Sequence, residues 1–170
     1  AWREWMPSAT VVEDTEVLDL TEGAHDLVIH ALSLHWADDP IGQLVQCRRA
    51  LASDGLFIAT SFAGQTLHEL RSVIAEAEVA QTGGLSPRIL PMGEIRDLGG
   101  LLQRAGFALP VADTTPLTVT YDTPIHLMRD LRAMGEGNAM DARHRTPTRR
   151  AIFAQAMQRY VDAFAMDDGR

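Results

Sequence analysis

Lysine is absent from this 170-residue sequence, and arginine fills all 15 of its Lys-or-Arg positions. A chain without lysine has no Schiff-base nucleophile, no lysine general base and no P-loop lysine to bind phosphate. Cysteine is scarce as well, because Cys47 is the single one. One cysteine excludes an internal disulfide bond and is typical of a reducing compartment.

Positive charge and long apolar runs are also lacking. The formal net charge is −8, which argues against a nucleic acid or an anionic membrane surface as the main partner, since both attract cationic surfaces. No run approaches the roughly 18 apolar residues of a membrane span, and no signal peptide opens the sequence. We therefore expect a cytoplasmic protein with no nucleic-acid partner and no membrane span.

Length and composition favour one globular domain over residues 1–170. The hydrophobic content of 46% and the charged content of 22% are ordinary for such proteins. The histidines show no metal-ligand spacing, so no metal site is predicted, and His30 is expected to face a covering helix.

The most informative stretch contains two apolar strands joined by a helix. The strands are predicted at 27–34 and 56–62, and the helix begins at Asp39-Pro40. Strands that are apolar on both faces and joined by a helix belong to a parallel sheet covered on both sides. Such sheets bind ligands at the carboxyl ends of their strands, which here are residues 33–36 and 61–64.

Apolar periodicity predicts four further helices and three further strands. The helices follow a capping box at Thr66–Glu69, span Glu94–Ala105 with Gly106 as a left-handed cap, and begin at Thr123-Pro124 and near Thr146-Pro147. The strands are expected at 9–12, 109–113 and 117–121, and a helix end at 1–7.

Four segments resemble the class I S-adenosylmethionine-dependent methyltransferases: LVIHALSLHWADD, LASDGLFIATSFAGQTLHELR, GGLSPRILPMGEIRDLGGLLQRAGF and HLMRDLRAMGEGNA. The last segment indicates the branch of a complex I assembly factor described as a protein arginine hydroxylase. The malonyl-carrier-protein methyltransferase of biotin synthesis is a more distant relative. The resemblance implies an α/β fold with a Rossmann-like class I methyltransferase sheet, and an enzyme that uses S-adenosylmethionine.

Two departures from the family pattern bear on cofactor binding. The family's glycine-rich loop and the acidic residue that ends its second strand have no counterpart here, and Val11 falls where the third strand would be. The family's last strand has no counterpart either. We therefore expect an incomplete sheet, weak cofactor binding by this chain alone, and a homodimer through exposed sheet edges.

The resemblance also implies a set of site residues. Asp14 matches an acidic residue that accepts a hydrogen bond from the adenine amino group, and the strand end at 31–33 lies beside the sulfonium. The cofactor-binding candidates are Asp14, Ala31, Leu32, Ser33 and His35, and the substrate-pocket candidates are Trp36 and Phe62. No catalytic residue is assigned.

His35 and Trp36 carry the most chemistry in this set. An imidazole can act as a base or a hydrogen-bond donor near neutral pH, and an indole can stack on a ligand or on a cationic methyl donor. The structural alternative is that both side chains only fill the strand end.

Three functions stay open at this stage. The first is modification of a protein arginine by this superfamily's chemistry. The second is O-methylation of a small molecule or carrier protein, with an acidic substrate held by Arg88, Arg129 or Arg132. The third is a non-catalytic assembly module that kept the fold.

Overall fold

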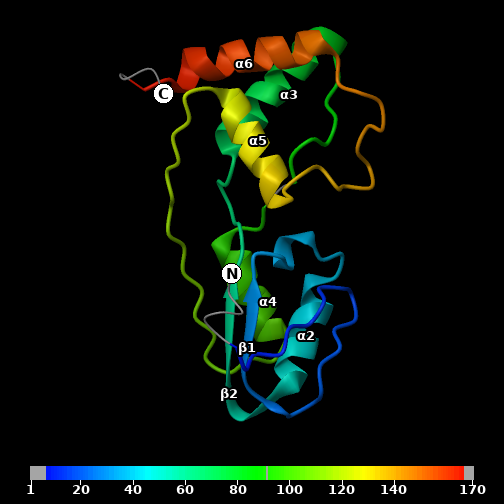
Figure 1. Cartoon of the computed structure of the whole chain (residues 1–170), viewed down its shortest axis with the longest axis vertical. Helices are drawn as coiled ribbons and strands as arrows, with labels where there is room; N and C mark the ends of the chain where they lie inside the picture. The colour runs from blue at the N-terminus through cyan, green and yellow to red at the C-terminus, as the bar shows by residue number, and fades with distance from the viewer. Residues whose placement is uncertain (1–6, 91, 167–170) are drawn as a thin grey trace. The chain divides into compact units, whose positions relative to one another are not determined.

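The computed structural model describes residues 7–90 and 92–166 of the chain. The elements, in chain order, are β1 (His25–Ala31), the 3-10 helix η1 (Leu34–Trp36), α2 (Pro40–Ala50), β2 (Leu51–Thr60), α3 (His68–Thr82), α4 (Ile95–Arg104), α5 (Pro124–Met134) and α6 (Arg150–Phe164) (Figure 1). They form two compact units. The sheet unit runs up to Gly64 and includes Met92–Thr114, and the helical unit contains the rest of the described chain.

The sheet unit is built on a parallel strand pair with a helical crossover. β1 pairs with β2 in a register that places Val28 opposite Phe57 and Ala31 opposite Thr60. α2 connects the two strands; Asp39 caps it by accepting a hydrogen bond from the Gly42 N–H at 2.9 Å. The predicted α/β class is confirmed, and the parallel strand pair with its helices agrees with the incomplete class I methyltransferase fold that the resemblance implies.

The core of the sheet unit lies on one face of the strand pair. Phe57 of β2 stacks on Phe107 with ring centroids 4.7 Å apart. One apolar cluster of this core has Leu34, Leu44 and Ala105 as its buried members, and Val45, Phe57, Leu101, Leu102 and Phe107 pack against them. The opposite face carries Leu27, Ile29, Leu56 and Ile58, which stay 44–57% exposed. Among the described residues, the strand pair is therefore covered on one face, where the sequence predicted cover on both.

The strand boundaries differ from the predicted ones. β1 ends at Ala31, because Leu32 takes a left-handed conformation with φ 54° and η1 follows. β2 begins directly after α2, so Asp54-Gly55 lies inside the strand instead of in a turn before it. The register shifts between His25 and Leu27, which accommodates the positive φ of Asp54.

The helical unit packs α3 against α6. Its buried residues are Leu70, Val73, Ile74, Ala77, Ile152 and Ala156. The predicted capping box at Thr66–Glu69 is wrong, because the N-cap of α3 is Leu67 in a left-handed conformation with no side-chain cap. The Glu69 carboxylate instead accepts a hydrogen bond from the Tyr160 hydroxyl at 2.7 Å.

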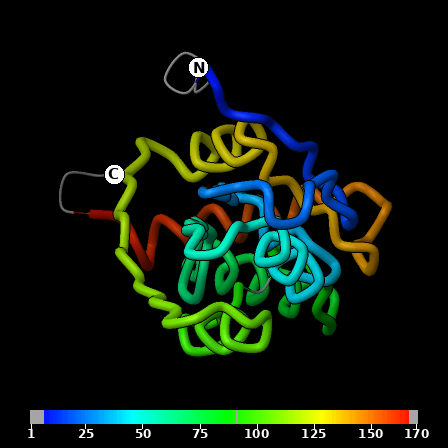
Figure 2. The backbone as a smooth tube through the Cα atoms, turned by 90° about the horizontal axis from the view of Figure 1, so that it is seen from below, coloured from blue at the N-terminus to red at the C-terminus, as the bar shows by residue number. Residues whose placement is uncertain are grey.

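The other helices follow the sequence more closely than the strands do. α4 lies within a residue of its predicted span, Gly106 has φ 87° as expected of a left-handed cap, and α5 begins at Pro124. α6 begins at Arg150, later than Thr146-Pro147. The strands predicted at 9–12, 109–113 and 117–121 do not form, and residues 107–123 run without helix or strand (Figure 2).

Two further expectations concern the ends of the chain and membranes. The helix end predicted at 1–7 lies almost wholly outside the described residues. Among residues 7–90 and 92–166, the structure contains no helix long and apolar enough to cross a membrane.

Candidate cofactor site at the carboxyl ends of the strands

The carboxyl ends of β1 and β2 lie side by side at one edge of the sheet. The Leu32 N–H donates to the Thr60 carbonyl at 2.8 Å, which continues the ladder one residue beyond β1. The left-handed turn at Leu32 then directs the chain into η1, with Ser33 as its N-cap. The predicted residues Ala31, Leu32 and Ser33 therefore lie together where a parallel sheet binds its ligands.

An aromatic cluster of His35, Trp36 and Phe62 lies next to these strand ends. The His35 ring lies 5.3 Å from the Trp36 ring and 5.2 Å from the Phe62 ring, centroid to centroid, with Phe62 edge-on. Ser61 Oγ lies 3.4 Å from His35 Nδ1. The fold thus brings together three residues that the sequence placed after two different strands. Their rings can bind a planar or cationic group.

Asp14 lies on a loop that α2 holds in place. Gln43 Nε2 donates to Asp14 Oδ1 at 3.2 Å and to the Thr15 carbonyl at 3.0 Å. One turn further along α2, Gln46 Nε2 donates to the Glu16 carbonyl at 2.9 Å. Gln46 Oε1 accepts a hydrogen bond from the Leu18 N–H at 2.8 Å. The two glutamines replace the strand predicted at 9–12 as the means of fixing Asp14.

Both glutamines and the hydrogen bond of His30 to Gln43 were absent from the residues predicted for the site. Gln43 is 2% exposed and His30 7% exposed, and the His30 ring does face α2, with its Nε2 3.1 Å from Gln43 Oε1. The available signal was a pair of amides three residues apart on the apolar side of a predicted helix. Such amides are buried only when their hydrogen bonds are satisfied.

The residues at this edge fit part of S-adenosylmethionine. Asp14 is exposed, so a ligand can reach its carboxylate. A carboxylate has about four lone-pair positions, and it can therefore accept a hydrogen bond from a ligand amine in addition to the one from Gln43. The small Ala31 side chain allows close approach, and the aromatic cluster suits a cationic sulfur. The donor and acceptor types thus match the adenine and sulfonium ends of the molecule.

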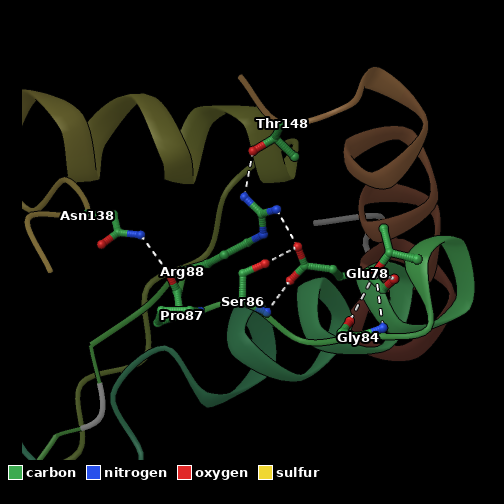
Figure 3. Close-up of polar contacts among 8 residues, drawn as sticks. Glu78, Gly84, Ser86, Pro87, Arg88, Asn138 and Thr148 are labelled. Carbon is green, nitrogen blue, oxygen red and sulfur yellow. Dashed lines mark hydrogen bonds and ion pairs between the residues drawn. The ribbon is translucent and has the colours of Figure 1, made fainter. Parts of the chain in front are cut away.

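In the helical unit, a buried carboxylate holds Arg88 (Figure 3). Glu78 is 3% exposed, and it accepts hydrogen bonds from the Ser86 hydroxyl at 2.6 Å and from Arg88 Nη2 at 2.5 Å. Burial alone raises the pKa of Glu78, but the bonds from Arg88 and Ser86 outweigh burial and lower this pKa to about 2.

The Arg88 guanidinium also bonds to the segment that precedes α6. Its Nη1 donates to Thr148 Oγ1 at 2.6 Å, and Asn138 Nδ2 donates to the neighbouring Pro87 carbonyl at 2.9 Å (Figure 3). Arg88 is therefore bound within the fold, which argues against its predicted role in holding an acidic substrate. Arg129 and Arg132 of α5 are exposed and keep that possibility.

Metal chemistry is not indicated among the residues that the structure describes. No group of three or more His, Cys, Asp or Glu side chains among residues 7–90 and 92–166 is arranged to hold a metal ion.

Comparison with known proteins identifies the family. Residues 2–59 match a family model described as a methyltransferase domain. The human protein "Arginine-hydroxylase NDUFAF5, mitochondrial" is 40% identical over 164 residues, which are 96% of this chain and 47% of that protein. The "Putative methyltransferase RP459" of Rickettsia prowazekii is 31% identical over 89% of this chain and 66% of its own length. The chain belongs to the methyltransferase superfamily.

Other relatives of this methyltransferase-family chain are less similar to it than the arginine hydroxylases are. The "Malonyl-[acyl-carrier protein] O-methyltransferase" of Nitrosospira multiformis is 35% identical over 88% of the chain and 47% of that protein. The chain spans about half the length of the curated relatives it matches first. The superfamily predicted from the sequence is confirmed, and so is the similarity to arginine-hydroxylase relatives that the segment HLMRDLRAMGEGNA indicated. The family uses S-adenosylmethionine in general. The site residues stay predictions.

Proposed function

We propose that the protein containing this chain binds S-adenosylmethionine at the carboxyl ends of β1 and β2 and acts on an arginine side chain of a protein. The observation that carries the proposal is the convergence of His35, Trp36 and Phe62 at that edge. The names of the relatives support the choice of substrate, because several are arginine hydroxylases that match 95–96% of this chain.

Each predicted residue has a separate task in this proposal. Asp14 accepts a hydrogen bond from the adenine amino group, and Ser33 and the small Ala31 allow close approach beside the sulfonium, where Leu32 turns the chain away. His35 lies against the cofactor and orders the cluster, while Trp36 and Phe62 border the substrate.

The cofactor supplies a methyl group on a positively charged sulfur. What the chain contributes is binding and orientation, which by themselves lower a barrier by several kcal/mol, about 7–11 in favourable cases. A side-chain base is not obligatory for methyl transfer, so no catalytic residue is assigned.

The test uses the protein as its gene encodes it. Titration calorimetry with S-adenosylmethionine and S-adenosylhomocysteine measures cofactor binding, and mass spectrometry of arginine-containing peptides identifies the product. We expect binding, and a mass gain equal to either a methylene unit or an oxygen atom on arginine. The first gain indicates methylation and the second hydroxylation. Absence of cofactor binding would instead favour a non-catalytic assembly module.

Carrier-protein O-methylation is a second candidate, favoured by malonyl-carrier-protein methyltransferases that are 34–35% identical to this chain. In this case Arg129 and Arg132 would face the acidic substrate. The double substitution R129Q/R132Q should then raise the KM for a malonyl-carrier protein and leave cofactor affinity unchanged.

Partners and location follow as further proposals. Pairing of two copies through the edges of the strand pair would satisfy the outer backbone groups of β1 and β2. Cytoplasmic residence is retained as proposed from the sequence, although the names of several relatives include the word mitochondrial.

A further inference from the structure

Two polar side chains, His30 and Gln43, are buried in the sheet unit without belonging to the predicted ligand contacts. Their exposed fractions are 7% and 2%. Burying such groups is unfavourable unless their hydrogen bonds are satisfied. Their partners are each other, the Thr15 carbonyl, and two residues of the candidate site, Asp14 and Ser33. We name the chain of hydrogen bonds Ser33–His30–Gln43–Asp14 the Gln43 relay.

The partners of Gln43 fix the orientation of its amide. Its Nε2 lies 3.2 Å from Asp14 Oδ1 and 3.0 Å from the Thr15 carbonyl oxygen. Both oxygens accept, so both amide N–H groups are used there. Gln43 Oε1 then faces His30 Nε2 at 3.1 Å and requires a donor. The His30 proton therefore lies on Nε2, and Nδ1 is the acceptor toward Ser33 Oγ at 3.5 Å.

All the donors of the Gln43 relay consequently point the same way. Ser33 donates to His30, His30 to Gln43, and Gln43 to Asp14. Bonds that run in one direction polarise one another, and this series ends on a carboxylate. The Asp14 carboxylate is thus held in one orientation on an exposed loop. A ligand amine meets an acceptor there, whereas a ligand carbonyl oxygen meets a second acceptor and is repelled.

We propose that Gln43, with its amide oriented by His30, is a positioning residue through which Asp14 selects an exocyclic amine over an oxo group on a purine ligand. The inference rests on the proposed function, in which Asp14 faces the adenine ring. It extends the site from the residues at the strand ends to a buried pair that touches no ligand.

Gln46 offers a matched control for Gln43. It is the same residue type one turn further along α2, and it holds the same loop. Its bonds go to the backbone of Glu16 at 2.9 Å and Leu18 at 2.8 Å, and not to the Asp14 carboxylate. Loosening the loop in general would affect both variants, but losing the orientation of Asp14 would affect only the Gln43 variant.

The experiment measures the affinities of the full-length protein for S-adenosylhomocysteine and for its inosine analogue, in which an oxo group replaces the amine. We expect the unmodified protein to prefer the adenine compound by about tenfold or more, the scale of one hydrogen bond to a charged group. Gln43→Met should remove most of this preference, as should Asp14→Asn, and Gln46→Met should keep it.

The possible results separate this inference from the proposed function. An unchanged preference in folded Gln43→Met protein would overturn the role of Gln43 and leave cofactor binding intact. Failure of the unmodified protein to bind either compound would overturn the proposed function itself. If Gln43→Met does not fold, Gln43→Glu replaces it, because the carboxylate still accepts from His30 while both N–H groups are lost.

A ligand-free measurement tests the direction of the Gln43 relay. Nitrogen NMR of the imidazole ring should show the His30 proton on Nε2 in the unmodified protein and in Gln46→Met. A proton on Nδ1 in the unmodified protein would reverse the direction of the bonds and overturn the inference, whatever the ligand result.

Discussion

Cys47 lies on α2 with 1% of its surface exposed, and burial together with the negative charge of Asp14 raises the pKa of its thiol to about 11. A thiol with so high a pKa is almost entirely protonated at neutral pH and is a poor nucleophile. Glu78 shows the opposite case, since its charged form is the one that the fold stabilises. At the scale of single residues, the environment decides which groups react and which only support the structure.

The Glu78–Arg88 pair makes the helical unit sensitive to acid. The pKa of Glu78 is about 2 in the folded chain against an ordinary 4.5, so its stabilising effect is complete above about pH 4.5 and is lost as the pH falls toward 2. Glu78→Gln should lower the free energy of unfolding at pH 7 by about 3 kcal/mol, the lower end for a buried pair, because Arg88 keeps 19% exposure.

Urea unfolding at pH 7 and pH 3 checks this prediction. The difference between Glu78→Gln and the unmodified protein should be smaller at pH 3. Glu76→Gln is the control, because Glu76 also pairs with an arginine, Arg159, at 2.8 Å but stays 59% exposed. Equal effects of the two substitutions would contradict the argument from burial.

α2 shows how one helix serves both the fold and the site. Asp39 caps its first turn, Leu44 and Cys47 fill the core, and Gln43 and Gln46 hold the loop that carries Asp14. Gln43 lies in the first turn of the helix, close to the Asp39 cap. A substitution that displaces this cap is therefore expected to move Gln43 as well.

Gly42 provides the test at this scale. A methyl group there would collide with the carboxylate of Asp39, so Gly42→Ala should displace the cap and lower stability by about 1 kcal/mol. Gly100 of α4 is the control, because a methyl group there meets nothing within 4 Å. Gly100→Ala should raise stability by about 0.5–1 kcal/mol, the usual gain inside a helix. Thermal unfolding of both variants measures these changes in stability. An increase in the stability of Gly42→Ala would contradict the collision with Asp39.

The whole chain is organised as two compact units, each with its own buried core. The chain passes between them after Gly64, before Met92 and after Thr114. The sequence predicted a single domain over residues 1–170, which stays a prediction, because contact geometry alone does not decide whether the two units unfold together. Because each unit has its own core, we expect a destabilising substitution in one core to increase local unfolding in that unit alone.

A pair of leucine substitutions tests this expectation. Leu44 is 1% exposed in the sheet unit and Leu70 is 4% exposed in the helical unit, so replacement of either by alanine should cost about 2–5 kcal/mol. Hydrogen exchange followed by mass spectrometry should show faster exchange in β1, β2, α2 and α4 for Leu44→Ala, and in α3 and α6 for Leu70→Ala. Faster exchange throughout the chain in both variants would support a single cooperative domain.

Elements with local signals could be predicted, whereas those that need a distant partner could not. α4 and α5 follow from apolar spacing with Gly106 and Pro124 as boundaries. The strand predicted at 117–121 fails although its residues alternate, because a strand requires a neighbouring edge for its backbone hydrogen bonds. Leu117 and Val119 are 86% and 67% exposed as a result.

The candidate site divides along the same line. His35, Trp36 and Phe62 could be selected from the sequence, because residues that follow parallel strands meet at one edge of the sheet. The amides of Gln43 and Gln46 were a signal of buried hydrogen bonds, but their partners could not be predicted, because these lie about 30 positions earlier in a loop without regular structure. Arg88 was misjudged for the same reason, since nothing local indicates the bonds to Glu78 and Thr148.

The sequence by itself determined the parallel β1–α2–β2 unit, most of the helices, and the superfamily, because each depends on patterns within a short segment or on matched segments. Only the tertiary structure decided which alternating segments became strands, which arginine is bound internally, and how Asp14 is held. Those outcomes depend on hydrogen bonds between residues far apart in the chain, and such bonds leave no local pattern.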